Sequence, residues 1–450
     1  MNQSFLSRIY KLYILCLPFG RLFELPLGDF LNKIISQFST LIMLIGVLVI
    51  FITRGIRFRN GRNDIFANIY IYMVIVSTIM AFVLTFSLET YSESPLSAIL
   101  GDVVLYLFVI LSVYFNTYCL IHCVTIDNLY KLFDCQIVIL LIVGYSQFLG
   151  ILGLSAPYNL LSSVFALREL SWLIEVDRGV TFFGTEPSSA SILCFVVIPY
   201  LYSNIKLQRG TTRMLYIIAL LMFTFLVLCS NSSQFLILFV GSSVLFLWSC
   251  FGAIRRYFYY LSFACGAFFA LEYLATESVT MTNSTDNESL EYVILGKIVD
   301  RENESTAMRA STVINDIKVF AEYPLIGVGD GNQGFFYADN QPNWTKESQE
   351  VSDLILANII PNGGGNFFPS YLSAYGILGI VVLLFFIRKY RILYRTSFLM
   401  KDRRMDLIFQ IAIILFLFAG WHVVGIKQSE TIIFILSLPC VTLNSYKPQV

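Results

Sequence analysis

Long apolar stretches that contain almost no charged residues restrict the fold of this chain more than any other feature of its sequence. Residues 65–87 and 98–121 are examples, and both exceed the roughly 20 residues that a helix needs to cross the hydrocarbon core of a bilayer. In lipid, backbone N–H and C=O groups find partners only within the protein, so each such stretch must be helical. With 57% hydrophobic and 13% charged residues and a mean hydropathy of +0.72, the composition excludes an ordinary soluble domain. The sequence predicts an all-α polytopic membrane protein.

The apolar stretches predict about twelve transmembrane helices. They lie at 8–27, 34–53, 65–87, 97–121, 134–153, 187–204, 214–229, 234–252, 257–274, 367–387, 407–426 and 430–444. The chain then has three parts, with helices one to nine in 1–274, one large and partly helical loop in 275–366, and the last three helices in 367–450. We expect the first helix to be a retained anchor rather than a signal peptide.

Clusters of Lys and Arg residues predict which ends of the helices face the cytoplasm. The clusters lie at 54–62, 206–213, 255–256 and 388–404. Cation-rich loops remain on the cytoplasmic side of a membrane. With twelve crossings both termini lie in the cytoplasm, all four clusters share that side, and 275–366 lies on the opposite side. The formal net charge is zero, so nothing indicates nucleic acid as a partner.

The long loop differs in character from the membrane segments, because it holds fourteen acidic and five basic residues and none of the nine cysteines. No disulfide framework is therefore predicted. Within the loop, 303–323 has the spacing of an amphipathic helix that ends before Pro324 and covers the bundle. Its apolar positions are Met308, Val313, Ile317, Phe320 and Ala321, and we expect Val313, Ile317 and Phe320 to be buried.

The first candidate site is the segment 178–190, which reads R-G-V-T-F-F-G-T-E-P-S-S-A and leads into a predicted helix. A helix start attracts anions through its free N–H groups and its dipole, and Arg178 can chelate phosphate oxygens. The alternative is an ordinary helix cap with an arginine that reaches the membrane surface. The residues alone leave both interpretations open.

The second candidate site combines Arg301, Arg309 and the glycine turn at 324–332, P-L-I-G-V-G-D-G-N. The two arginines are about two helical turns apart on nearly one face, where they can grip a diphosphate. They can equally pair with nearby carboxylates on a solvated surface. The candidate substrate-binding residues of the turn are Gly327, Gly329 and Asn332.

Metal and nucleotide chemistry find no support in the sequence. The two histidines, His122 and His422, have no second pair of ligands that would complete a zinc site. There is no Walker glycine loop, no G-x-S-x-G elbow and no H-E-x-x-H pair. No D-x-D motif, which would hold a metal-bound nucleotide, occurs either. We therefore predict no metal and no cofactor, and a sugar donor activated by a nucleotide becomes less attractive than a lipid-linked one.

The layout and the two motifs resemble the O-antigen polymerase and ligase superfamily of bacterial envelopes. The similarity in layout covers nearly the whole chain, with one large loop before the last three helices. The motifs are R-G-x-x-x-x-G-x-E-P-S-S-A at 178–190, and Arg309 followed by a helix and P-L-I-G-V-G-x-G-N at 324–332. A third, weaker similarity begins at Asn366, which is a further candidate substrate-binding residue, and ends at Gly379.

This resemblance implies a metal-independent glycosyltransferase of the bacterial inner membrane, with its active site facing the periplasm. Its substrate would be undecaprenyl-diphosphate-linked oligosaccharide. Arg178 and Arg309 match the two arginines that the family places near the diphosphate, whereas Arg301 has no firm match. Glu186 is the candidate acceptor for the proton of the attacking hydroxyl, although it can also serve only to cap the helix. Arg168 with Gly179 fits an R-x10-G spacing of such polymerases, a pattern loose enough to arise by chance.

Ligases of the superfamily carry a histidine just before the helix that follows the long loop, and residues 275–366 contain none. The sequence therefore favours an O-antigen polymerase over the alternative, a ligase that transfers polysaccharide to lipid A-core. A flippase or transporter of the lipid-linked oligosaccharide is a further alternative, which the few charges inside the helices disfavour. Membrane lipid, a chain-length regulator and a flippase are the partners that a polymerase implies.

Overall fold

The computed structural model describes most of the chain. The described residues are 3–18, 38–54, 64–85, 95–163, 165, 167, 169–175, 179–184, 187–230, 232–249, 255–275, 304–357, 366–421 and 429–442. Within them the secondary structure is helical apart from one isolated bridge between Ser397 and Thr442. The described part of the chain is therefore all-α, as the apolar stretches predict.

Each of the twelve predicted segments coincides at least in part with a helix. These helices are α1 (Gln3–Cys16), α3 (Phe38–Arg54), α4 (Asp64–Thr85), α5 (Pro95–His122), α6 (Ile126–Ile151), the 3-10 helix η1 (Pro187–Phe195) with α9 (Val197–Leu207), α10 (Gly210–Leu228), α11 (Ser233–Ser249), α12 (Arg255–Ala275), α18 (Phe367–Arg395), α19 (Arg403–Ala419) and α20 (Glu430–Ser437). The largest difference in length is at α18, which continues past residue 387 to Arg395. Its last turns carry part of the basic cluster, because Lys and Arg are good helix formers that need not stop where the apolar stretch stops.

Six helical segments in the described residues are long and apolar enough to cross a membrane. They are 64–84, 103–122, 126–151, 188–207, 210–228 and 367–395. Three further apolar helices, at 38–53, 233–249 and 430–440, are shorter. These features are those of a multi-pass membrane protein, and the count of twelve crossings stays a prediction.

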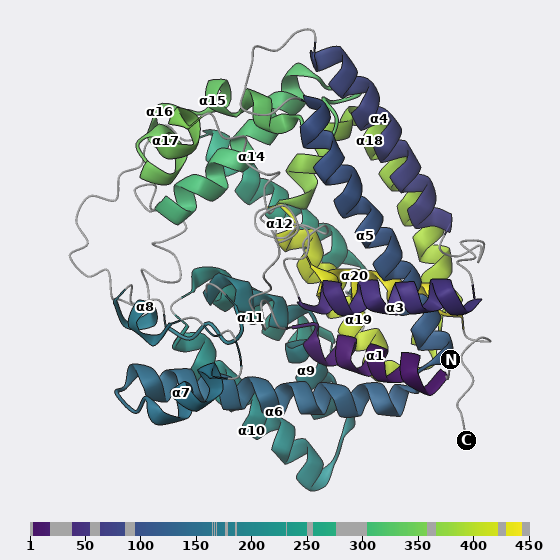
Figure 1. Cartoon of the computed structure of the whole chain (residues 1–450), viewed down its shortest axis with the longest axis vertical. Coiled ribbons are helices and arrows are strands. Elements are labelled where there is room, and N and C mark those ends of the chain that lie inside the picture. Colours follow the sequence, from purple (N-terminus) through teal and green to yellow (C-terminus); the bar gives the residue numbers. More distant parts are fainter. Residues whose placement is uncertain are drawn as a thin grey trace.

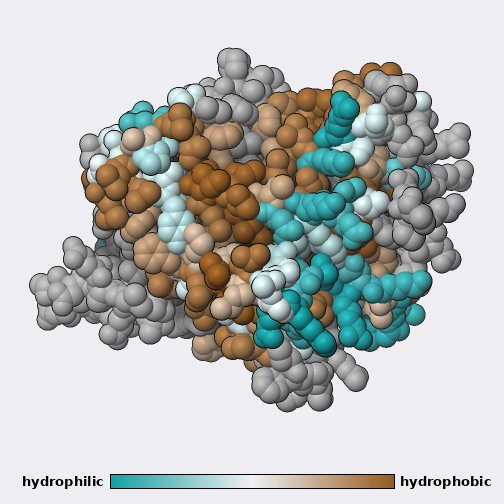
Figure 2. All heavy atoms as spheres, turned by 90° about the horizontal axis from the view of Figure 1, so that it is seen from below, coloured by the Kyte–Doolittle hydropathy of each residue, from teal (hydrophilic) through white to brown (hydrophobic). Residues whose placement is uncertain are grey.

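The outer surface of the helices is strongly hydrophobic. Leu215 and Leu221 of α10 are 66% and 64% exposed, and Ile71, Ile75 and Ile79 of α4 are all more than half exposed. Figure 2, which views the molecule from below Figure 1, shows broad hydrophobic areas beside a hydrophilic band. A protein in water rarely exposes apolar surface on this scale, whereas lipid covers it without cost.

Two groups of helices run in different directions (Figure 1). Helices α4, α5 and α18 pack side by side, and α1, α3 and α6 run across them. Phe115 of α5 joins the groups, because its fully buried ring packs edge-on against Tyr10 and Tyr13 of α1. The long loop lies at the far end of the first group from α1 (Figure 1).

The loop helix α14 (Glu304–Glu322) confirms the predicted amphipathic helix almost to the residue. It packs against α18 and α12, and the short helices α15 (Tyr337–Asn340), α16 (Asn343–Lys346) and α17 (Gln349–Leu356) cover its other side. Val313 is fully buried in the main core, Ile317 packs against that core, and Phe320 is half-buried. The prediction that the loop folds over the bundle is therefore confirmed for its described part, 304–357, although only Val313 of the three residues is fully buried.

The buried surface of α14 is wider than the predicted apolar stripe. Ala321 is exposed, whereas Ala307, Ala310 and the polar residues Asn315 and Asp316 are buried. A helix covered on two sides buries more than one face. Spacing read from apolar residues alone misses the polar positions that it buries.

The predicted topology places Glu347 outside and Lys401 inside, with α18 between them, and both residues are exposed. A membrane-impermeant maleimide applied to intact cells should label Glu347→Cys above the background of the parent chain. It should label Lys401→Cys only after the membrane is permeabilised. Labelling of Lys401→Cys but not of Glu347→Cys in intact cells would overturn the topology.

Candidate functional site

Five of the predicted site residues lie where α14, the glycine turn and the start of α18 meet. They are Arg309 on α14, Gly327, Gly329 and Asn332 on the turn, and Asn366, which precedes the first residue of α18. The other four, Arg168, Arg178, Glu186 and Arg301, lie outside the described residues. Their approach to this site stays a prediction.

A break in helix α18 organises the site. Gly376 has φ 59° and ψ −154°, which interrupts the helical hydrogen bonds in the middle of a buried segment. The turn after α14 replaces the lost bonds from both sides of the break. The N–H groups of Val328 and Gly329 donate to the carbonyls of Ser373 and Ala374, at 3.0 and 2.9 Å. In return, the N–H groups of Ile377 and Leu378 donate to the carbonyls of Pro324 and Leu325, at 2.8 and 3.1 Å. The backbone groups that the break frees in these four residues of α18 thus have partners.

The close approach of the two backbones explains the glycines of the turn. Gly327 has φ +75°, and a Cβ there would lie 2.5 Å from the carbonyl oxygen of Ala374. Gly329 has φ +80°, and its Cβ would lie 2.8 Å from the Cα of Ser77 on α4. Their N–H groups donate to the carbonyls of Tyr323 and Ala374. The structure therefore gives both glycines a structural role, and direct contact with substrate stays a prediction.

Buried amide side chains fix the rest of the turn. Asn332 is fully buried and donates from Nδ2 to the Val328 carbonyl at 2.8 Å. Gln333 donates from Nε2 to Asp330 Oδ1 at 3.3 Å and to the Ser370 carbonyl at 3.1 Å. The N–H of Asp330 donates to Ser77 Oγ at 2.9 Å, which ties the turn to α4. The sequence motif includes Asp330, but nothing in its spacing indicated that Asp330 and Gln333 would be buried against α18.

Arg309 and Asn366 come together through Thr312. The Thr312 hydroxyl donates to the Arg309 carbonyl at 2.9 Å and accepts a hydrogen bond from Asn366 Nδ2 at 3.3 Å. Arg309 lies three residues before Thr312 on α14 and is half-buried. The packing of α14 on α18 thus places the backbone of Arg309 close to the start of a predicted membrane helix.

The short loop helices hold α14 on its other side. The Gln341 Nε2 donates to the Ser311 carbonyl at 3.1 Å, and Lys318 Nζ donates to the Asn340 carbonyl at 2.7 Å. The hydroxyls of Ser311 and Tyr337 lie 2.5 Å apart. Burial raises the pKa of Tyr337, so its phenol stays protonated and available for this contact.

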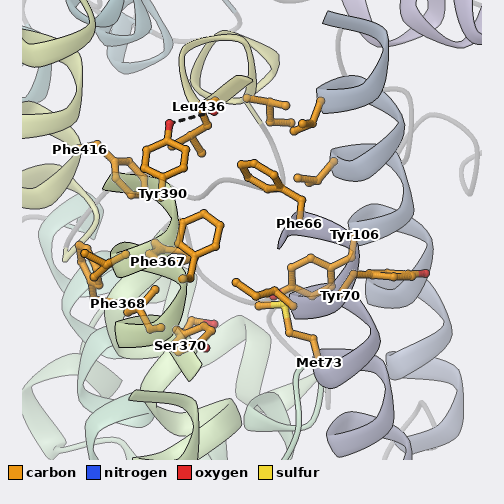
Figure 3. A pocket seen from close by; sticks show the side chains of 18 of the residues that line it. Phe66, Tyr70, Met73, Tyr106, Phe367, Phe368, Ser370, Tyr390, Phe416 and Leu436 are labelled. Atoms are coloured by element: carbon orange, nitrogen blue, oxygen red, sulfur yellow. Dashed lines mark hydrogen bonds between the residues drawn. The ribbon is translucent and has the colours of Figure 1, made fainter. Parts of the chain in front are cut away.

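A cavity of about 230 Å³ lies beside the site, between α4, α5, α18, α19 and α20 (Figure 3). Its lining is apolar and aromatic, with Phe66, Tyr106, Phe367 and Tyr390 among the walls. Asp330, Asn366 and Ser370 also line it, which connects the cavity to the turn. Three walls have helical spacing in the sequence, at residues 66–73, 106–113 and 383–390, but spacing alone does not show that these distant segments meet around one cavity.

Within the described residues no group of three or more His, Cys, Asp or Glu side chains is placed to hold a metal ion. In the part of the chain that the structure describes, the site contains Arg309, buried carboxamides and the buried residues Asp316 and Asp330. Such groups bind and orient polar or anionic substrates by hydrogen bonds and charge.

Residues 217–387 match the model of the O-antigen ligase family. The match covers less than half of the 450 residues, and it runs from α10 through the long loop into α18. Comparison with curated proteins gives no match. The family match supports the polymerase and ligase superfamily that the motifs resemble, and it does not separate the two activities.

Replacing the glycine at the break should weaken the contact between turn and helix. In Gly376→Ala the new Cβ would lie 2.6 Å from the Leu325 carbonyl carbon, at φ +59°. Gly210 has a similar φ, +64°, and a Cβ added there would meet no atom within 4 Å, so Gly210→Ala is the matched control. Both substitutions place a Cβ at positive φ, and at Gly376, where ψ is −154°, the backbone lies in a region that almost only glycine adopts, which costs about 1–3 kcal/mol. Gly376→Ala should lose roughly 1–3 kcal/mol more through the clash.

The measurement is thermal unfolding of the purified chain in detergent, followed by circular dichroism. Gly376→Ala should have a clearly lower Tm than Gly210→Ala. Equal values would show that the turn does not pack against the break as described.

Proposed function

We propose that this chain is an O-antigen polymerase, a glycosyltransferase that joins undecaprenyl-diphosphate-linked oligosaccharide units on the periplasmic face of a bacterial inner membrane during lipopolysaccharide synthesis. The observation that supports it best is the O-antigen ligase family match at 217–387, since this range contains α14, the glycine turn and the broken helix α18 up to residue 387. Arg309 lies within the match, half-buried beside the start of α18.

The reaction sets the requirements for the site. The oxygen of an acceptor hydroxyl attacks the anomeric carbon of the donor sugar and forms the new glycosidic bond. The bond from that carbon to the diphosphate oxygen breaks, and the hydroxyl proton passes to a base. Negative charge grows on the departing diphosphate, and fixed guanidinium groups stabilise it most when they need not reorganise. We assign this role to Arg309 and Arg178, and the role of base to Glu186.

The surroundings of Arg309 suit such a role. Its helix is packed on two sides, so the position of its backbone is fixed before substrate binds. The loop carries fourteen acidic and five basic residues, which leaves few cations that can bind an anion. A half-buried arginine presents a planar fork to phosphate oxygens in a medium less polar than water, where the attraction is stronger.

The ligase activity is the second candidate, because the matching family is described as O-antigen ligase. A polymerase is favoured by the absence of histidine from 275–366, where ligases of the superfamily carry one. The packing of α14 on α18 and α12 favours an enzyme over a transporter. It makes the loop an ordered part of the protein that can hold catalytic residues, rather than only a connection between helices.

Arg309→Lys should impair polymerisation, because it keeps the charge and loses the two-pronged hydrogen bonding of the guanidinium. Loss of one preorganised charge-stabilising donor costs on the order of a hundredfold in rate. Arg309→Ala should be at least as severe. The measurement is the polysaccharide ladder in cells that lack the native protein, with the amount of each variant in the membrane determined in parallel.

Lys346→Ala is the control for Arg309, because Lys346 is an exposed cation of the same loop. Lys318 is a poorer control, since its ammonium holds the Asn340 carbonyl. Lys346→Ala should build a normal ladder. If Arg309→Ala accumulates normally and also builds a full ladder, Arg309 has no part in the chemistry.

Deletion of the chain should separate the two activities. A strain without a polymerase still transfers single repeat units to the outer lipid, whereas a strain without a ligase transfers none. We expect lipopolysaccharide with one repeat unit on a gel. Complete absence of repeat units would favour the ligase.

A further inference from the structure

The turn after α14 exposes apolar side chains where the long loop meets a predicted membrane helix. Leu325 is 69% exposed, and Ile326 beside it is also exposed. On α18, Ile377 and Leu378 are bonded through their N–H groups to the carbonyls of Pro324 and Leu325, and both are exposed as well. The turn and the middle of α18 therefore share one apolar outer surface.

The unbroken second half of α18 gives the depth of the turn. No charged residue occurs between Phe367 and Ile387, and Arg388 is an exposed cation that follows directly. A cation is costly in hydrocarbon, so Arg388 marks one surface of the membrane. Leu378 lies ten residues before Arg388, which corresponds to about 15 Å of helix. The hydrocarbon core is roughly 30 Å thick, so Leu325, bonded to Leu378, lies near its middle.

Helix α4 gives a similar depth independently. A Cβ added to Gly329 would lie 2.8 Å from the Cα of Ser77, and the N–H of Asp330 donates to Ser77 Oγ at 2.9 Å. Ser77 lies eight residues before Thr85, the last residue of α4, so this contact is about 12 Å from that end of the helix. Residues 64–84 are long and apolar enough to cross a membrane. The contacts with both helices thus place the turn inside the bilayer.

Irregular backbone inside a bilayer needs hydrogen-bond partners within the protein, because lipid offers none. The turn meets this requirement through α18. The N–H groups of Val328 and Gly329 donate to α18, and the carbonyls of Pro324 and Leu325 accept from it. The bonds that repair the break in α18 therefore also allow the turn to lie in hydrocarbon.

Helix α14 leads to the turn from the membrane surface opposite Arg388. It follows the first half of α18 in the same direction, because Thr312 is bonded to Asn366 and Asp316 to Ser373. Its last residue, Glu322, is exposed. The Cα–Cβ bonds of a helix tilt toward its N-terminus, which here is the end of α14 nearer that surface. The carboxylate of Glu322 is therefore directed away from the middle of the bilayer.

We propose that the turn after α14 is inserted in the bilayer, where Leu325 and Ile326 contact the hydrocarbon chains of membrane lipids. The long loop then enters the membrane and leaves it on the same side. Arg309 and Asn366, at the other end of this packed pair of helices, lie near the membrane surface. The inference goes beyond the proposed function, because it depends on the position of the turn and not on the reaction.

The experiment measures the depth of a fluorescent label on single cysteines. The full chain, with its nine native cysteines replaced by serine or alanine, is placed in phosphatidylcholine nanodiscs. Thermal unfolding first shows that this background is folded. A bimane label is then attached at Leu325→Cys, at Leu384→Cys on the exposed face of α18, or at Leu356→Cys at the end of α17.

Leu356 is the matched control for Leu325, because it is an exposed leucine of the same loop, 83% exposed. Asp353, one turn earlier on α17, is exposed too, which is typical of a helix in water. Figure 1 places α17 on the opposite side of α14 from α4.

Three quenchers report on three environments. They are a lipid with a nitroxide near the end of its acyl chain, a lipid with a nitroxide on its headgroup, and iodide in the water. Iodide should quench the label at Leu325 at least about tenfold less than the label at Leu356. The acyl-chain nitroxide should quench at Leu325 and Leu384 but not at Leu356. Its advantage over the headgroup nitroxide should be larger at Leu325, since Leu384 lies only about 6 Å from Arg388 along the helix.

Charge substitutions test the same point through stability. Leu325→Asp would place a carboxylate in hydrocarbon and should lower the Tm in nanodiscs. Leu356→Asp, in water, should leave the Tm nearly unchanged. Leu325→Phe keeps the side chain apolar and should keep the Tm of the parent chain. If Leu325→Asp does not accumulate, the label measurement decides, because it introduces no charge.

The proposal is overturned if iodide quenches the labels at Leu325 and Leu356 equally, because the turn then faces water. It is also overturned if no quencher reaches the label at Leu325, because a protein surface then covers the turn. Equal Tm values for folded Leu325→Asp and Leu356→Asp would contradict it as well. None of these measurements needs polymer synthesis, so they decide the position of the turn whether or not the Arg309 variants build a ladder.

Discussion

The exchange of backbone hydrogen bonds between the turn after α14 and the break in α18 is the interaction on which the rest of the site depends. A helix in a bilayer cannot leave N–H and C=O groups without partners, and lipid supplies none. Val328 and Gly329 serve one side of the break at Gly376, and Pro324 and Leu325 serve the other. The long loop is therefore a structural part of the helix bundle, and α14 is held against α18 because the turn at its end completes that helix.

This arrangement also explains why the turn is rich in glycine. The resemblance of P-L-I-G-V-G-x-G-N to a motif of a transferase superfamily suggests contact with substrate, yet at Gly327 and Gly329 the nearest atoms to a Cβ belong to α18 and α4. The contacts of the two glycines thus give the motif a structural role, which holds the turn against α18 and α4. Asn366 and Ser370 lie on the part of α18 before the break, and Arg309 lies on α14 before the turn. The hydrogen bonds between the turn and the break therefore hold both parts of the site together.

The sequence predicted those parts of the fold that one segment determines by itself. The length of the apolar stretches located the membrane helices. The spacing of apolar residues within 303–323 located α14 within one residue of its observed ends. The break at Gly376 was not predicted, because a glycine within an apolar stretch does not by itself indicate a helix break. The break becomes understandable only once the turn that bonds to it is known. The cavity was missed for the same reason, since its lining comes from residues as distant as Phe66 and Leu436. Of the arginine pair, the structure places Arg309 and leaves Arg178 a prediction.

Asn366 links the loop to the start of α18. Its Nδ2 donates to the Thr312 hydroxyl on the helix that carries Arg309, and the same residue is part of the wall of the apolar cavity between α4, α5, α18, α19 and α20. A closely packed helix cannot shift without disturbing the helices that contact it. The packing of α14 on α18 therefore fixes the backbone of Arg309 near the start of a predicted membrane helix. Because the turn after α14 also completes α18 at Gly376, the position of Arg309 and the shape of the cavity wall depend on the same backbone contacts.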